Sequence, residues 1–426
     1  VFGAPLAMAA LIAFFLESVF LGLWIFGWGR LSRKLHLGVL WAAVIGSWLS
    51  AYFIIAANSF MQHPVGALLN PETGRAELDP SQGSILAVLT NVTAMAAFPH
   101  VVSGAWLVAG AFLTGVASWH MVKHHRAARE MGLETEEGQE QHRAARDLYR
   151  PTVRFGVVAM FVSAIVLVIS GDFQAQIMFK QQPMKMASAE SLCETETGPG
   201  FSVLSIGRQN NCENIEHVIE IPKMLSFLAN HDFDSTLQGV EELQEQYTRA
   251  FAGQPNVPAN QNFAPNLFVT YWGFRAMITW ALGSVVVALG GLWFTRRKRV
   301  VESRRFGFIA LLMIPTPFLA NSSGWIFTEM GRQPWVVAPN WEDDLDPLRI
   351  SMLVQNGVSN HSASTVLVTL IGFTLLYGAL GVVWFMLQRR YVIEGPAAHD
   401  ARPPGHTDDD ESDSDSDEPK QLSFAY

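Results

Sequence analysis

Long apolar stretches separated by polar connections dominate this chain. Seven of them reach the roughly 20 residues that a helix needs to cross the hydrocarbon core of a bilayer. They run over 4–27, 37–61, 94–120, 155–178, 267–294, 306–329 and 364–387. The pattern therefore predicts an all-α polytopic membrane protein with seven transmembrane helices.

Two polar segments interrupt the apolar pattern. Residues 180–265 form a long connection with short amphipathic patches, such as the one from Ile215 to Leu228. The segment from Tyr391 onward alternates Asp and Ser and cannot bury enough apolar area to fold. The sequence thus divides into helices over 1–179, a long loop over 180–265, helices over 266–390 and a disordered acidic tail over 391–426.

The basic residues of the short connections gather in alternate loops. Three lie at 30–34, seven at 123–154, six at 296–305 and two at 389–390, whereas the other short loops hold one or two. By the positive-inside rule, the N-terminal end lies outside and the acidic tail is cytoplasmic. The same assignment makes the long loop over 180–265 extracytoplasmic.

Composition supports a membrane class. The chain has 426 residues, of which 50% are hydrophobic and 16% charged, so an ordinary soluble enzyme is excluded. Its net charge of −9 belongs mostly to the tail, where eight of the eleven residues from Asp408 to Glu418 are acidic. We expect no nucleic-acid partner. The start at Val1, directly followed by apolar sequence, predicts an incomplete or processed chain without a signal peptide.

Both cysteines, Cys193 and Cys212, lie in the long loop. Two cysteines exclude a multi-cysteine zinc site and a cysteine-ligated iron–sulfur cluster. An oxidising outer face allows a disulfide that would stabilise the loop by about 3 kcal/mol, and two free thiols are the alternative.

Three polar groups within the apolar stretches are candidates for chemistry. An ionisable group at the membrane centre costs about 2.5–3.5 kcal/mol, so Glu17, near the midplane of the first helix, is either a proton relay or a carboxyl held neutral by a neighbouring helix. His100 and Met277 are predicted at similar depth on the third and fifth helices. Packing roles would explain both, but together they can provide the two axial ligands of a low-spin haem.

Charged and aromatic residues flank these positions. Arg275 lies two positions before Met277, about 200° round the helix, and can reach the rim of a porphyrin but not the same atom. Trp325, Glu329 and Arg332 are spaced to share one face of the sixth helix. An interfacial Trp with a capping salt bridge would explain that cluster. The alternative is a carboxylate that ligates or borders a second iron porphyrin.

Several motifs give the chain a family resemblance. They are Phe2-Gly3-Ala4-Pro5-Leu6-Ala7, Ala13-Phe14-Phe15-Leu16-Glu17-Ser18, Ala57-Asn58 with Met61-Gln62, Phe274-Arg275 with Met277, and Gly331-Arg332-Gln333-Pro334-Trp335. With these motifs the sequence resembles subunit I of the cytochrome bd-type quinol oxidases from Val1 to about Arg390. The resemblance implies nine helices in the complete subunit and a quinol-binding role for the long loop.

The resemblance also implies cofactors and roles for particular residues. His100 and Met277 match the axial ligands of a low-spin haem b, and Glu329 matches the ligand of a high-spin haem b. A third haem, haem d or a further haem b, would take its histidine from outside this chain. Glu17 matches the proton-pathway carboxylate of the family. Lys185 and Glu190 match residues of the loop that the family uses for quinol.

The implied reaction is quinol oxidation at the outer face with reduction of dioxygen to water. Protons taken up from the inside would make the reaction build a proton gradient in a prokaryotic cytoplasmic membrane. The family works as a heterodimer with a homologous subunit II, with or without small accessory subunits. The type of quinone and the type of the third haem stay open.

Two departures from the family pattern keep other functions in view. Two family helices, the first with the haem d histidine, precede the point that matches Val1. Ala9 also occupies a position where the family has a second glutamate. A catalytically altered haem-binding paralogue is therefore one alternative. The other is a multi-pass transporter in which Glu17 and Arg275 bind a substrate or ions.

Overall fold

The computed structural model describes residues 1–426 except 71, 209, 211, 255, 341–349 and 396–426. Within the described residues, seven helical spans are long and apolar enough to cross a membrane, which confirms the predicted fold class. They run over Gly3–Phe26, Arg33–Gln62, Val92–Met131, Glu136–Gln181, Leu267–Phe294, Arg304–Met330 and Ala363–Glu394. The fourth span is the longest of the seven, because its helix begins at Glu136, in charged sequence that precedes the predicted apolar stretch over 155–178.

Some spans consist of several helical segments. The first span joins α1 (Gly3–Met8), the π-helical segment η1 (Ala9–Phe14) and α2 (Phe15–Phe26), and the fourth joins α6 (Glu136–Arg143), η3 (Ala144–Tyr149) and α7 (Arg150–Gln181). The sixth is divided into α12 (Arg304–Leu312) and α13 (Thr316–Met330), with Pro315 and Pro317 at the break. Proline lacks the backbone donor that a continuous helix needs. The remaining spans are α3 (Arg33–Gln62), α5 (Val92–Met131), α11 (Leu267–Phe294) and α14 (Ala363–Glu394).

The chain forms two compact units. One comprises the described residues of 1–23 and 37–359, and the other the described residues of 24–36 and those from Asn360 onward. In the second unit, the ring of His36 lies 4.6 Å from that of Trp28. Its helix α14 continues to Glu394, beyond the boundary predicted at residue 390. The acidic part of the predicted tail lies outside the described residues.

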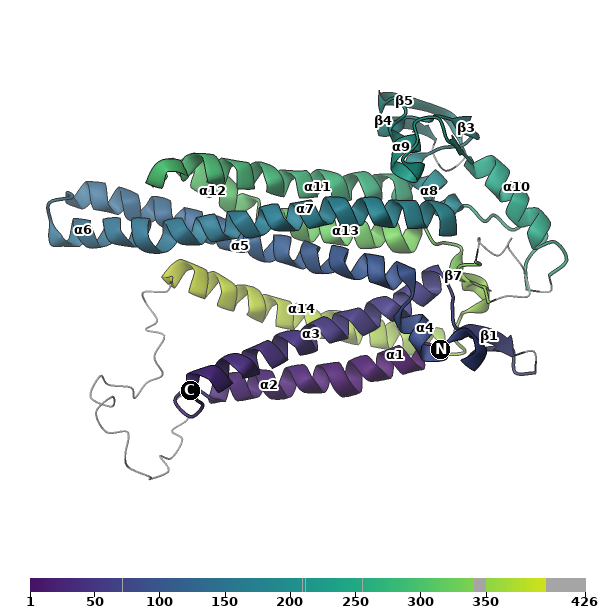
Figure 1. Ribbon diagram of the computed structural model, residues 1–426, viewed down its shortest axis with the longest axis horizontal. Coiled ribbons are helices and arrows are strands. Elements are labelled where there is room, and N and C mark those ends of the chain that lie inside the picture. The colour runs from purple at the N-terminus through teal and green to yellow at the C-terminus, as the bar shows by residue number, and fades with distance from the viewer. Residues whose placement is uncertain (71, 209, 211, 255, 341–349, 396–426) are drawn as a thin grey trace. The chain divides into compact units, whose positions relative to one another are not determined.

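Helices of the first unit pack in two close pairs, α5 along α7 and α11 along α13. Figure 1 shows these four helices side by side. Gly110 on α5 permits the first approach, because a Cβ atom there would lie 2.9 Å from the carbonyl oxygen of Gly156 on α7. Close backbone contact through small residues is typical of helix pairs in membranes.

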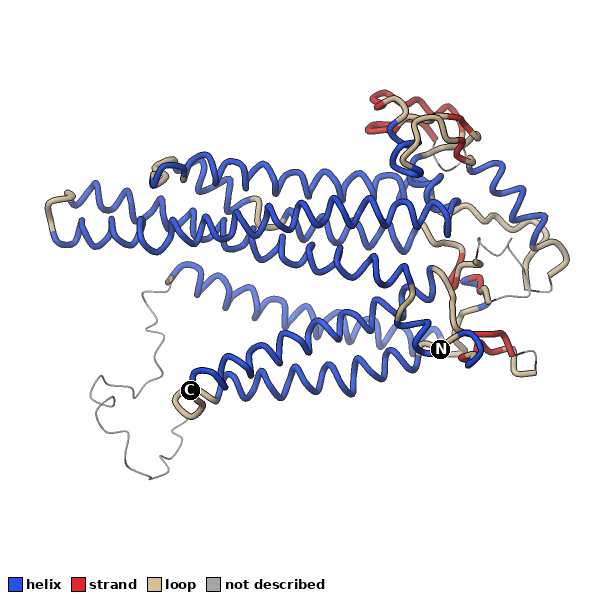
Figure 2. Tube along the Cα trace, in the orientation of Figure 1, coloured by secondary structure: helices blue, strands red, loops and turns tan. Residues whose placement is uncertain are grey.

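The long loop predicted over 180–265 is folded. It contains α8 (Pro183–Glu190), β3 (Glu196–Thr197), β4 (Phe201–Arg208), β5 (Glu213–Ile221), α9 (Met224–Asn230), β6 (Thr236–Leu237) and α10 (Val240–Ala250). β4 pairs antiparallel with β5, and β3 with β6. Figure 2 shows these strands at the end of the helices where α8 lies.

Buried aromatic residues organise this loop around Trp335, which lies in β7 (Trp335–Val337). The Trp335 ring lies 5.6 Å from that of Phe263 and 5.1 Å from that of Phe251. The smaller elements of the unit are β1 (Ala67–Asn70), β2 (Arg75–Leu78), α4 (Ser84–Leu89) and β8 (Met352–Leu353). β1 pairs with β2 and β7 with β8, both antiparallel.

A disulfide joins Cys193 to Cys212, in agreement with the pairing that the sequence allowed. It links the residues after α8 to the start of β5, with a sequence separation of 19. Closing a loop of this length restricts the unfolded chain, so the bond stabilises the folded loop by about 3 kcal/mol.

Replacing both Cys193 and Cys212 by serine is therefore expected to increase local opening of residues 193–212. The measurement is amide hydrogen exchange of the intact protein, in which opening about 100-fold more frequent corresponds to a loss of about 3 kcal/mol. Wild-type protein treated with a reductant provides the matched control. Unchanged exchange in both samples would contradict the stabilising role.

Candidate functional site

The two quinol candidates lie on α8, and neither is on a solvated surface. Side chains from Met184 to Glu190 are buried, and Lys185 and Glu190 are only 2% and 3% exposed. The Lys185 ammonium lies 5.3 Å from the ring centre of Phe327 on α13. Gly331, just after α13, leaves room for Lys185, because a Cβ atom there would lie 2.8 Å from its Cγ.

Burial changes the acid–base properties of Lys185. Removal from water disfavours its charged form, and the nearby Arg332 guanidinium adds to this effect while Glu329 opposes it. The pKa of the Lys185 ammonium is lowered to about 7. Lys185 can therefore exchange a proton near neutral pH, unlike an exposed lysine.

Glu190 forms a buried ion pair with Arg275 of α11. Arg275 Nη2 donates to Glu190 Oε2 at 2.5 Å, and Arg275 Nε donates to the carbonyl oxygen of Ser202 at 3.0 Å. Arg275 Nη1 also donates to the carbonyl oxygen of Ala189. Burial raises the pKa of the Glu190 carboxyl although the guanidinium opposes this. The pair anchors both the end of α8 and strand β4 to α11.

Glu329 on α13 is held from two sides. Asn58 Nδ2 of α3 donates to Glu329 Oε1 at 2.7 Å, and Arg332 Nη2 donates to Glu329 Oε2. The predicted helical face of Trp325, Glu329 and Arg332 is only partly helical, because α13 ends at Met330 and Arg332 folds back from the following turn. Trp325 is exposed and Arg332 is buried.

A chain of polar contacts links the two groups of candidates. Lys185 Nζ donates to Gln62 Oε1 at 3.3 Å, and Gln182 Nε2 donates to the same oxygen at 2.8 Å. Asn58 and Gln62 are four residues apart on α3 and so share one face of it. The end of α3 therefore contacts both the Glu329 carboxylate and Lys185.

His100 and Met277 lie on different helices of the first unit. His100 on α5 has its Nδ1 3.0 Å from Ser170 Oγ on α7. Met277 on α11 faces α13, where a Cβ atom at Gly324 would lie 2.9 Å from its sulfur. Gly171 faces His100 in a similar way, because a Cβ atom there would lie 3.4 Å from His100 Cε1. Both candidate ligands thus lie beside glycines.

Ala9 is the first residue of the π-helical segment η1, and Glu17 lies in α2, just after that segment. Ala9 is buried in an apolar cluster with Ala13 and Phe53. The backbone of Glu17 is close to α3, since a Cβ atom at Gly46 would lie 2.8 Å from the Glu17 nitrogen. The Glu17 carboxylate is half-buried and has no hydrogen bond or ion pair with any described residue. Its role as a proton relay stays a prediction.

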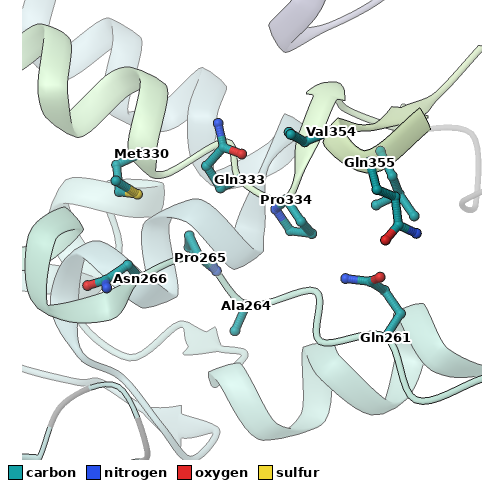
Figure 3. Close-up of a pocket in the computed structure, with 10 residues that line it drawn as sticks. Gln261, Ala264, Pro265, Asn266, Met330, Gln333, Pro334, Val354 and Gln355 are labelled. Atoms are coloured by element: carbon teal, nitrogen blue, oxygen red, sulfur yellow. The ribbon is translucent and has the colours of Figure 1, made fainter. Parts of the chain in front are cut away.

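A groove of about 460 Å³ lies between the end of the loop, the turn after α13 and residues 353–355. Figure 3 shows the amides of Gln261, Asn266 and Gln333 together with Pro265 and Pro334 at its wall. None of Lys185, Glu190, Arg275 or His100 lines it. The groove is therefore distinct from the predicted quinol residues.

The donor set fits haem. Imidazole and thioether are common axial ligands of haem iron, and the carboxylate of Glu329 is a further oxygen donor on α13. Several buried side-chain atoms have no hydrogen-bond partner among the described residues, and two of them, the donors Gln62 Nε2 and Arg332 Nε, belong to residues that contact Lys185 and Glu329. A bound ligand with oxygen acceptors would accept hydrogen bonds from these donors, which is why they are unpaired in its absence.

Sequence reasoning missed three features of this site: the pairing of Arg275 with Glu190, the contact of Asn58 with Glu329, and the place of Gln62. Asn58 and Gln62 are polar residues at the end of an apolar helix, four positions apart, and that spacing was the available signal. The pairing of Arg275 had no local signal, because its partner lies 85 residues away.

Comparisons with known proteins place this geometry in a family context. The sequence profile of cytochrome bd terminal oxidase subunit I matches residues 1–396. The cytochrome bd ubiquinol oxidase subunit 1 of Bacillus subtilis (strain 168) is 33% identical over 400 residues, covering 94% of this chain and 76% of the relative. The cytochrome bd-II ubiquinol oxidase subunit 1 of Escherichia coli (strain K12) is 29% identical over 457 residues, covering 95% and 82%.

A solved structure shares the fold. The bd oxidase from Geobacillus thermodenitrificans superposes with a TM-score of 0.66 at 22% identity, and the match covers 92% of this chain and 79% of that chain. At this level of identity the likeness supports the arrangement of helices and carries no residue roles.

Proposed function

This chain belongs to the cytochrome bd terminal oxidase subunit I family, and we propose that it is the subunit that oxidises quinol at the folded loop and carries the haems for dioxygen reduction. Membership makes it a multi-pass membrane oxidoreductase of a respiratory terminal quinol oxidase, with haem cofactors. The observation that carries the finer proposal is the burial of Lys185 and Glu190 against α13 and α11, the helices of Glu329 and Met277.

Three residues are proposed to hold iron. His100 and Met277 would ligate a low-spin haem b, and Glu329 a high-spin haem b, with a third haem, d or b, ligated from outside this chain. When bound, the haems pass electrons from quinol to dioxygen. Asn58 and Arg332 orient the Glu329 carboxylate, while Trp325 lies one turn before it on α13.

Lys185 and Glu190 are proposed to act on quinol. A neutral Lys185 amine can accept a proton from a quinol hydroxyl, because its pKa of about 7 leaves it partly unprotonated at neutral pH. Glu190 keeps α8 in place through Arg275. Arg275 thus has two proposed roles: it holds Glu190 in place, and it contacts the rim of a porphyrin.

The proposed orientation follows from the alternation of basic loops, with the folded loop outside and the chain end after α14 inside. Quinol protons would then leave on the outer side. Glu17 is the proposed site for protons that cross from the inside, and each charge crossing is worth about 2.3 kcal/mol per 100 mV. The proposed partner is a homologous subunit II, with or without accessory subunits.

Replacing Lys185 by methionine is expected to lower quinol oxidation about 100-fold, the usual effect of losing a general base. The wild-type rate should rise with pH through about 7, because the amine accepts a proton only when it is uncharged. The variant should lose this rise. The measurement is oxygen consumption with quinol by the complete oxidase over a range of pH, with absorbance spectra to verify that the haems stay bound.

Lys180→Met is the matched control, since Lys180 is exposed at the end of α7. It should keep both the rate and the pH profile. Equal rates for Lys185→Met and wild type would reject Lys185 as the base. A complete wild-type oxidase that binds haem but consumes no oxygen with quinol would instead favour the catalytically altered paralogue. That alternative is based on Ala9, which occupies a position where the family has a glutamate.

A further inference from the structure

The side-chain amide of Gln62 has a hydrogen-bond donor that the protein itself does not use. Gln62 is the last residue of α3 and is 4% exposed. Its Oε1 accepts from Lys185 Nζ and from Gln182 Nε2, whereas its Nε2 has no partner among the described residues. Several buried side-chain atoms lack a partner among the described residues, and two of them, this donor and Arg332 Nε, belong to residues that contact Lys185 and Glu329. Because buried polar groups are almost always paired, the two donors together indicate an acceptor outside the chain.

Rotation of the amide cannot remove the mismatch. Gln182 Nε2 also donates to the main-chain oxygen of Gln62 at 2.6 Å, which holds Gln182 with its N–H groups toward Gln62. If the Gln62 amide flipped, its own N–H groups would face those of Gln182. The observed orientation is therefore the one in which Oε1 is satisfied and Nε2 is left over.

The surroundings select an anionic acceptor. Arg332 is a buried cation that pairs with the Glu329 carboxylate, and the Lys185 side chain is buried beside them. Arg332 Nε is a second buried donor without a partner in the described structure, and Lys185 Nζ makes one hydrogen bond there, to Gln62. An unused guanidinium donor and an unused amide donor together stabilise a carboxylate much better than a neutral oxygen.

Helix α3 connects this donor to the candidate iron ligand. Asn58, one turn before Gln62, donates to Glu329 Oε1 at 2.7 Å. We propose that Gln62 Nε2 donates a hydrogen bond to a propionate carboxylate of the porphyrin whose iron Glu329 ligates, with Lys185 and Gln182 holding the amide in that orientation. This inference rests on the proposed function, because it requires a haem at Glu329.

The test is Gln62→Glu in the complete purified oxidase. The substitution is nearly isosteric and retains an oxygen that accepts from Lys185 and Gln182, but it replaces the Nε2 donor with a second oxygen. At neutral pH the new carboxylate repels a propionate, so the content of high-spin haem per protein should fall about tenfold, the factor expected for losing a hydrogen bond to a charged group. Acidification should restore it, because a protonated carboxyl donates again.

Gln181→Glu is the matched control. Gln181 is equally buried, but both ends of its amide have partners, His63 and Thr93. This variant should retain the high-spin haem at every pH. Haem content is measured by extraction as pyridine haemochrome, and the high-spin and low-spin forms are distinguished by absorbance of the intact protein.

Three results would overturn the inference. They are a Gln62→Glu protein with wild-type haem content at all pH values, an equal loss in both variants, and a raised KM for quinol with unchanged haem, which would make quinol the acceptor. A wild-type oxidase without haem would refute the proposed function itself. A failure of the inference about Gln62 is therefore distinguishable from a failure of the proposed function.

Discussion

Alanine at His100 or at Met277 is expected to abolish the low-spin haem signal in the reduced-minus-oxidised spectrum of the complete oxidase. A low-spin haem of this type needs two strong axial ligands, and alanine offers none. In the His100 variant, Ser170 would lose its hydrogen bond with the imidazole, but the extensive packing of α5 against α7 should keep these helices together. The high-spin signals should persist, because Glu329 lies on α13 and keeps its contact with Asn58.

Two substitutions on the same pair of packed helices are suitable controls. His120 lies on α5 and Met160 on α7, both fully buried and neither predicted to bind iron. His120→Ala and Met160→Ala should keep the low-spin spectrum even if they destabilise the protein. A low-spin signal that survives in His100→Ala or Met277→Ala would refute the ligand assignment.

Replacing Arg275 by methionine is expected to destabilise the protein by about 3–5 kcal/mol, the usual cost of leaving one member of a buried ion pair without its partner. The loss is large because the guanidinium bonds Glu190 and the carbonyl oxygens of Ala189 and Ser202. Its face also lies 3.9 Å from the ring centre of Tyr271. The measurement is denaturant unfolding in detergent, together with proteolysis of the folded loop.

The exposed pair Arg249–Glu245 on α10 provides the comparison. Its nearest charged atoms are 3.9 Å apart and both side chains are largely exposed, so Arg249→Met should cost less than about 1 kcal/mol. Combining Arg275→Met with Glu190→Gln should cost less than the sum of the single changes, because the double variant no longer buries an unpaired carboxylate. Equal losses for Arg275→Met and Arg249→Met would contradict the structural role of the buried pair.

The apolar spans were predictable because a membrane helix satisfies its own backbone hydrogen bonds, so its length and composition suffice to identify it. Six of the seven predicted stretches lie within the observed spans, and the first, 4–27, extends one residue beyond the span Gly3–Phe26. Motif residues were predictable for a similar local reason, since Gly331-Arg332-Gln333-Pro334-Trp335 is recognisable without knowing what it touches. The structure adds that Trp335 in this motif forms the aromatic centre of the folded loop.

Long-range contacts were beyond the sequence. The loop over 180–265 is polar on average, yet its apolar residues meet around Trp335, which comes from a distant part of the chain. Apart from the family resemblance, nothing in the sequence distinguishes Lys185 from the other lysines of that polar segment. Its packing against Phe327 and Gly331 buries the side chain and thereby lowers its pKa.

By itself the sequence determined the membrane class and the seven spans, and it predicted His100, Met277 and Glu329 as candidate ligands, which stays a prediction. Only the tertiary structure decided which polar groups meet: Arg275 with Glu190, Asn58 with Glu329, and Gln62 with Lys185. The physical reason is that helix formation depends on neighbours along the chain, whereas a buried polar contact depends on which helices pack together, and Asn58 and Glu329 are separated by 271 residues.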